Sequence, residues 1–182
     1  MFYAEKEIVL KNGKTALLRS PKETDAAEML EYLKAVSAET EFLLREPEDC
    51  METVEQERKW LAGIVESDTN LMIVCTVDGK VAGNCHLSWK NRKKVRHRAS
   101  IGIALLKPYW NLGIGTKMFE EMIAVAVEQG ISQLELEFVE GNDRAQALYE
   151  KMGFQIIGER PNAFHMKDGS VRKEYIMVKQ IS

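Results

Sequence analysis

Residues 105–117 read Leu-Leu-Lys-Pro-Tyr-Trp-Asn-Leu-Gly-Ile-Gly-Thr-Lys and join a strand-like apolar run to a segment with helical periodicity. At the start of a helix, unpaired backbone N–H groups and the positive end of the helix dipole converge. Glycines such as Gly113 and Gly115 let a diphosphate reach those N–H groups without a side chain intervening. The pattern therefore predicts a phosphate-binding turn, although two glycines also suit a tight turn that binds nothing.

Two other phosphate-binding motifs are excluded. A Walker loop requires G-x-x-x-x-G-K-[ST], which this chain lacks. The dinucleotide fingerprint G-x-G-x-x-G requires a third glycine where Met118 stands. The predicted site is therefore of another kind.

A second pattern follows, in which the strand-like residues 134–139 precede a helical segment and a glycine. Its characteristic residues are Asn142, Ala145, Leu148, Tyr149, Glu150, Lys151, Gly153 and Phe154. Together the two segments resemble the GNAT (Gcn5-related N-acetyltransferase) superfamily. The first is similar to its [Q/R]-x-x-G-x-[G/A] pyrophosphate loop and the second to its N-x-x-A-x-x-L-Y-E-K-x-G-F signature. The resemblance covers about a third of the chain, from Ile101 to Phe154.

The remaining sequence reads as an N-terminal hairpin, two helices and two strands before these segments, and a strand pair after them. The last strands are predicted at residues 154–159 and 171–178, with a loop over residues 160–170. The order indicates one domain over residues 1–182, of the α/β (α+β) class. The resemblance implies a GNAT-type mixed central sheet of about six to seven strands flanked by about four helices.

The resemblance also implies an enzyme that uses acetyl-CoA as cosubstrate, with no metal, and acetylates a primary amine by direct attack in a ternary complex. The cofactor-binding residues that it implies are Ile103, Ala104, Leu105, Asn111, Leu112, Gly113, Ile114, Gly115, Thr116, Asn142, Ala145 and Tyr149. A non-catalytic module that binds acyl-CoA is the alternative from another class. The resemblance allows a homodimer.

Two residues depart from the family pattern. Trp110 stands where the family usually has Gln or Arg, so one polar contact to the cofactor is expected to be missing. Ser100 stands where many members have a glutamate on the strand before the loop. Because that glutamate is a common general base, its absence leaves open which group acts as the general base here.

Tyr149 is the position of the family's usual general acid. A phenol with a pKa near 10 is protonated at neutral pH and can protonate a thiolate; a buried tyrosine with a structural role is the alternative. In members similar to the ribosomal-protein alanine acetyltransferases, a glutamate five residues before the signature Asn is the base, and Glu137 holds that place. Glu135 shares its strand face, and a water molecule or a solvent-facing role for Glu137 stays open.

The acceptor is predicted to be a small amine or a peptide amine. In this family the loop between the first two helices and the loop between the last two strands usually border the acceptor site. The first loop carries Glu39, Glu41, Glu46, Glu48 and Asp49. Such carboxylates would attract a cation such as a polyamine, although acidic loops are also common as solvated surface. A protein or amino-acid acceptor is the alternative.

Composition narrows the class further. A net charge of −3 argues against a dedicated nucleic-acid binder, and the basic run at residues 92–98 reads as a solvated hairpin tip. No apolar run is long enough to span a membrane, so no membrane partner is expected. Three cysteines without a C-x-x-C pair and a charged N-terminus favour a reducing, cytoplasmic location. Three histidines without metal-ligand spacing predict no zinc site.

Overall fold

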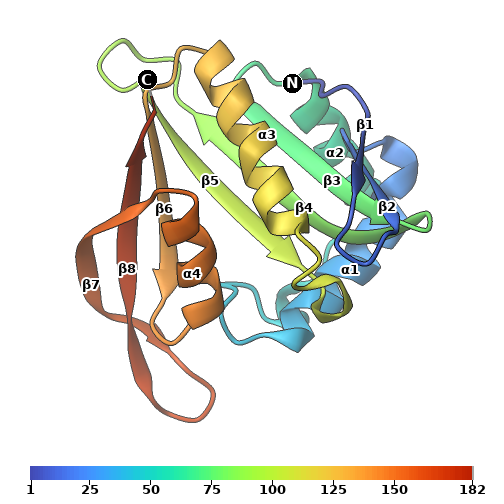
Figure 1. Cartoon of the computed structure of the whole chain (residues 1–182). Coiled ribbons are helices and arrows are strands. Elements are labelled where there is room, and N and C mark those ends of the chain that lie inside the picture. Colours follow the sequence, from blue (N-terminus) through green and yellow to red (C-terminus); the bar gives the residue numbers. More distant parts are fainter. Residues whose placement is uncertain (182) are drawn as a thin grey trace.

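The computed structural model describes residues 1–181 and contains one eight-stranded mixed sheet with helices on both faces (Figure 1). Within the sheet the strands follow the order β1-β2-β3-β4-β5-β6-β8-β7. Their bounds are β1 (Lys6–Val9), β2 (Thr15–Arg19), β3 (Asn70–Val77), β4 (Lys80–Trp89), β5 (Arg98–Leu105), β6 (Gln133–Val139), β7 (Gln155–His165) and β8 (Val171–Gln180). All neighbouring strands are antiparallel except β5 and β6, which are parallel.

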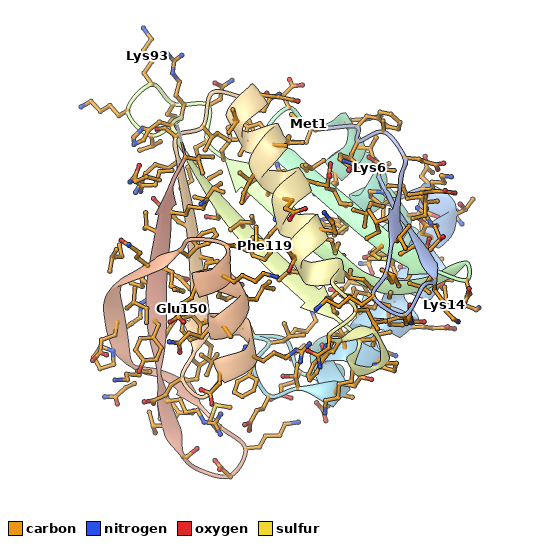
Figure 2. All side chains as sticks on the ribbon, in the orientation of Figure 1. Met1, Lys6, Lys14, Lys93, Phe119 and Glu150 are labelled. Atoms are coloured by element: carbon orange, nitrogen blue, oxygen red, sulfur yellow. The ribbon has the colours of Figure 1, made fainter. Side chains whose placement is uncertain are left out.

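Helices α1 (Ala26–Glu39) and α2 (Val54–Glu66) cover one face of the sheet, and α3 (Ile114–Glu128) and α4 (Asp143–Lys151) cover the other (Figure 1). The apolar positions of α3 recur at helical spacing, so Met118, Phe119 and Met122 all point into the core and are fully buried. Phe119 lies between α3 and the sheet (Figure 2). Burying such a side chain contributes roughly 1.5–3 kcal/mol.

The sheet is split between β5 and β6. The two strands pair at only three positions, Arg98 with Gln133, Ala99 with Leu134 and Ser100 with Glu135. Beyond Ser100, β5 continues along β4 while β6 continues along β8, and the strands diverge (Figure 1). The split leaves backbone N–H and C=O groups of β5 without a partner strand, available to a ligand.

The end of the chain differs from the sequence prediction. The sheet has eight strands rather than six to seven, and β7 runs from Gln155 to His165, so half of the predicted loop 160–170 is strand. Pro161 and the polar residues around it do not read as strand. The pairing with β8 tolerates them through a register shift between Arg160 and Phe164, where Asn162 has a φ of 53°. Only residues 166–170 connect the two strands.

Candidate active site

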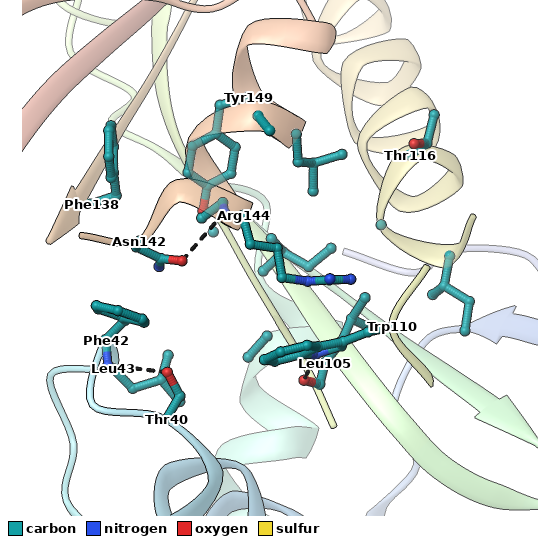
Figure 3. A pocket seen from close by; sticks show the side chains of 18 of the residues that line it. Thr40, Phe42, Leu43, Leu105, Trp110, Thr116, Phe138, Asn142, Arg144 and Tyr149 are labelled. Atoms are coloured by element: carbon teal, nitrogen blue, oxygen red, sulfur yellow. Dashed lines mark hydrogen bonds between the residues drawn. The ribbon is translucent and has the colours of Figure 1, made fainter. Parts of the chain in front are cut away.

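A cleft of about 810 Å³ occupies the split in the sheet (Figure 3). Ile101 to Leu105 of β5 form one wall and Glu137 and Phe138 of β6 form the other. The start of α3 and one side of α4 close it on one face of the sheet. On the opposite face it is bordered by Val36 and by residues of the α1–α2 loop. The cleft therefore passes through the sheet and can hold a different molecule at each end.

Almost all the predicted cofactor residues line this cleft: Ile103, Ala104, Leu105, Asn111, Gly113, Ile114, Gly115, Thr116, Asn142, Ala145 and Tyr149. Leu112 is the exception. Its carbonyl accepts a hydrogen bond from the backbone N–H of Lys11 at 3.1 Å, and its side chain packs against the core. The family resemblance implied these residues, and the fold brings them to one cleft from β5, the start of α3 and α4.

The two glycines of the turn have different structural roles. Gly113 is the N-cap of α3 with a φ of 91°, a left-handed conformation that other residues adopt only with strain. Gly115 lies inside the first turn of α3 and is buried. A Cβ atom there would lie 3.0 Å from Leu148 and 3.7 Å from Ile103. The missing side chain of Gly115 therefore permits close packing of α3 against α4 and β5.

Trp110 is anchored at the entrance of the turn. Its indole Nε1 donates a hydrogen bond of 2.7 Å to the carbonyl of Leu105, at the end of β5 (Figure 3). The guanidinium of Arg144, from the first turn of α4, lies 4.3 Å from the centre of the indole ring. Partial desolvation lowers the pKa of Arg144 below its usual range. Sequence analysis did not select Arg144, because only the folded chain places it on Trp110.

The turn is surrounded by positive charge. Lys11, Arg144 and Lys151 line the cleft, and the Nζ atom of Lys107 lies 5.9 Å from the Trp110 ring. Within residues 1–181 none of these four cations forms a salt bridge with a carboxylate. Lys151 donates instead to the hydroxyl of Thr116 at 3.2 Å. This end of the cleft therefore suits a ligand with several negative charges.

Tyr149 projects from α4 into the same cleft (Figure 3). Its ring is 7% exposed and packs among Phe119, Phe138 and Phe154, with ring centroids 5.6–6.3 Å away. Burial raises the pKa of Tyr149 to about 12. Its hydroxyl makes no hydrogen bond to the described part of the chain, so the proton is available to a ligand in the cleft.

Asn142 and Glu137 lie on either side of the loop between β6 and α4. The Asn142 side chain accepts a hydrogen bond of 3.3 Å from the N–H of Ala145, which makes it the N-cap of α4. The Glu137 carboxylate is about half exposed and lies 3.3 Å from Arg160 of β7. Arg160 also pairs with Glu174 of β8. Burial, and secondarily the charge of Glu137, raise the pKa of Glu174, while Arg160 opposes this effect.

The opposite end of the cleft carries polar groups that sequence analysis did not assign. His86 of β4 lines it directly across from Gly102 of β5, and the neighbouring pair on the same face is Ser88 with Ser100. His86 is half-buried, and desolvation alone lowers its pKa. Asn84 lies next on this face and accepts a hydrogen bond of 2.7 Å from Tyr32. Strand alternation could have identified this face of β4, but only the register shows that His86 lies opposite Gly102 and Ser88 opposite Ser100.

Three of the five carboxylates of the acidic loop form ion pairs. Glu41 pairs with Arg172 at 2.8 Å, and Lys167 lies 2.9 Å from Glu46 and 3.6 Å from Glu48. Glu39 accepts a hydrogen bond of 2.6 Å from the backbone N–H of Lys107. These carboxylates therefore hold the loop against β8, the β7–β8 connection and the start of the turn at Lys107.

Two further observations bear on the kind of site. In the described residues no group of three or more His, Cys, Asp and Glu side chains is placed to hold a metal ion. No helix among them is both long and apolar enough to cross a membrane. The basic run at residues 92–98 lies at one end of the molecule, where Lys93 extends into solvent (Figure 2), and it does not border the cleft.

The chain is similar to known proteins of one family. The model of the acetyltransferase (GNAT) family matches residues 33–154. A GNAT-family acetyltransferase from Streptococcus pneumoniae is 32% identical, with a TM-score of 0.85 over 92% of this chain and 99% of that one. A ribosomal-protein-alanine N-acetyltransferase from Brucella melitensis is 21% identical, with a TM-score of 0.77 over 90% and 99% of the two chains.

A ribosomal L7/L12 α-N-protein acetyltransferase solved in complex with coenzyme A has the same fold, at 17% identity and a TM-score of 0.76 over 91% of this chain and 94% of that one. The glycine turn, the split sheet and the unpaired cations fit a cosubstrate that carries a diphosphate. The chain belongs to the GNAT acetyltransferase family and is an acetyl-CoA-dependent N-acetyltransferase.

Proposed function

We propose that the protein acetylates a primary amine within a ternary complex, with Tyr149 as the general acid. The observation that carries this proposal is the single cleft, which joins the glycine turn, the Tyr149 hydroxyl and the polar face of β4. Acetyl-CoA enters from the side of α3 and α4, and the amine from the side of α1 and α2. The two substrates then meet at the split between β5 and β6.

Tyr149 donates its proton to the sulfur as the amine nitrogen attacks the acetyl carbon and the carbon–sulfur bond breaks. A phenol with a pKa of about 12 stays protonated throughout the neutral range and is therefore available as a donor. The apolar rings around Tyr149 fix its orientation and exclude water from one side of the reacting atoms. Positioning of this kind supplies part of the rate enhancement.

Glu137 is the proposed general base, directly or through a water molecule. In its support, Glu137 lines the cleft, whereas Glu135, which shares its strand face, lies at the closed end of the split. Glu135 is also held by Arg98 at 3.2 Å. The ion pair with Arg160 fixes the position of the Glu137 carboxylate on β6.

His86 is a second candidate for the base. It stands opposite Gly102, which has no side chain to cover it, on the sheet face that carries Ser100 in place of the family's glutamate. Because burial favours the neutral imidazole, His86 can accept a proton at neutral pH. A neutral His86 would reach the amine from β4, the neighbour of β5, where the family's glutamate stands at the position of Ser100.

The proposed acceptor is a cationic amine such as a polyamine. Arg172 and Lys167 pair with three of the five carboxylates of the acidic loop and offset part of its charge. Glu137, which lines the cleft, and Glu174 share the single cation Arg160, so negative charge exceeds positive charge within this group of three side chains. An amino acid or a protein N-terminus is the alternative acceptor, and a domain that binds acyl-CoA without turnover is the alternative function.

Thiol release tests the proposal. The protein is incubated with acetyl-CoA and a panel of polyamines, amino acids, aminoglycosides and N-terminal peptides, and free CoA is measured with a thiol reagent. We expect amine-dependent release, fastest with polyamines. A protein that binds CoA in calorimetry but releases no thiol with any class would support the binding module instead.

A further inference from the structure

The stacked pair of Trp110 and Arg144 has no role in the mechanism above. Trp110 replaces the polar residue that normally opens the glycine turn, and Arg144 comes from a different helix, α4. Both side chains line the cleft at the end where the turn lies (Figure 3). The guanidinium is 4.3 Å from the ring centre, within the range of a cation–π interaction.

We propose that Arg144, supported on the Trp110 ring, binds a phosphate group of acetyl-CoA and supplies the contact that Gln or Arg provides elsewhere in the family. The inference concerns cosubstrate binding and is independent of the acceptor and of the base. Trp110 is then a positioning residue that acts through Arg144, and the polar contact to the cosubstrate is not missing.

Arg144 is unpaired, whereas the other arginines near the cleft are paired. Arg160 and Arg172 each bind a carboxylate, while Arg144 forms neither a salt bridge nor a side-chain hydrogen bond within residues 1–181. A guanidinium has five N–H donors in a planar fork that matches two oxygens of a phosphate. Stacking on the indole occupies one face of this plane and leaves its donor edge available.

The Trp110 ring that supports Arg144 is itself held in place. The indole N–H of Trp110 is bound to the carbonyl of Leu105, the last residue of the strand that forms one wall of the cleft. The ring therefore keeps its orientation relative to β5 and to the glycine turn. Holding Arg144 in one place before the cosubstrate arrives reduces the conformational entropy lost on binding.

The experiment is calorimetry with three ligands: CoA, 3′-dephospho-CoA and pantetheine, which has no phosphate. We expect Arg144→Gln to weaken CoA binding about 10- to 100-fold, the range for a hydrogen-bonded charged pair. Arg144→Lys should lose less, because it keeps the charge but not the fork. Arg92→Gln, on the exposed hairpin tip, is the matched control and should bind CoA like the wild type.

The three ligands identify the phosphate. If Arg144 binds the pyrophosphate, Arg144→Gln loses the same factor with CoA and with 3′-dephospho-CoA. If it binds the 3′-phosphate, the loss disappears with 3′-dephospho-CoA. Either result supports the proposal. Undiminished CoA binding by Arg144→Gln overturns it, as does an equal loss with pantetheine.

The platform is tested by Trp110→Leu, which should weaken CoA binding about 3- to 10-fold, and by the double variant Arg144→Gln/Trp110→Leu. If Trp110 acts through Arg144, the double variant binds CoA no more weakly than Arg144→Gln alone. Fully additive losses would overturn the positioning role. Wild-type protein that fails to bind CoA would instead contradict the acetyl-CoA-dependent function, so the two failures are distinguishable.

Discussion

A Cβ atom on Gly115 would lie 3.0 Å from Cδ2 of Leu148, so the first turn of α3 and the side of α4 pack with no room for a larger residue. Gly115→Val should therefore lower the free energy of unfolding by about 1–3 kcal/mol, the usual cost of overpacking. For a domain of this size each kcal/mol lowers Tm by roughly 2–4 °C. Calorimetric melting and CoA titration should show both the lower Tm and weaker binding.

Gly63→Ala is the control for this substitution. Gly63 is an exposed position inside α2, with no atom within 4 Å of an added Cβ. Alanine is favoured over glycine in a helix, so the variant should gain about 0.5–1 kcal/mol. A Gly115→Val protein that melts with the wild type but cannot bind CoA would mean that Gly115 serves the cosubstrate alone.

Tyr149→Phe removes only the hydroxyl and keeps the ring among Phe119 and Phe138. We expect kcat to fall about 10²-fold with little change in KM for acetyl-CoA. Because the pKa of Tyr149 is about 12, its deprotonation should cause no loss of wild-type kcat between pH 6 and 10. Tyr175→Phe, at a ring stacked on Phe138 outside the cleft, should keep full kcat. Full kcat in Tyr149→Phe would mean that another donor serves the thiolate.

Three variants distinguish the candidates for the general base. Glu137→Gln should lower kcat about 10²-fold, whereas Glu135→Gln, at a carboxylate outside the cleft, should not. His86→Gln should change kcat/KM little if Glu137 is the base. If His86 is the base, the wild-type kcat/KM has an acid limb, and this limb lies below the ordinary histidine pKa of about 6.5 because burial lowers the pKa of His86. The His86→Gln variant would then lose that acid limb together with most of its activity.

The charge beside the cleft is tested with Glu174→Gln, which removes one of the two carboxylates that share Arg160. For a diamine, kcat/KM should fall several-fold at low salt, and the difference from wild type should shrink at high ionic strength. A neutral hydroxylamine substrate should show no such difference. Glu46→Gln, at a carboxylate already paired with Lys167, is the control. Equal losses in both variants would remove the Glu137–Glu174 pair from acceptor selection.

Structural features that are encoded within a few residues were predicted correctly, whereas features that depend on distant segments were not. The helix start at Gly113 and the cap at Asn142 are encoded within a few residues, and both lie where expected. The end of the predicted strand at residue 159 was wrong, because pairing with β8 outweighs the local effect of Pro161. The ion pairs of the loop carboxylates could not be predicted, because their partners Arg172 and Lys167 are more than a hundred residues distant in sequence.

The sequence alone carried the motif residues of the family resemblance. It also determined the start of α3 at its glycines and the place of Tyr149 on its helix, because glycine conformation and helical periodicity act over short spans. Only the tertiary structure decided which side chains meet across the split. It placed His86 opposite Gly102, set Arg144 on Trp110 and buried Gly115 beneath Leu148. These relationships depend on strand register and helix packing between distant segments, and no local pattern specifies which residues will be neighbours.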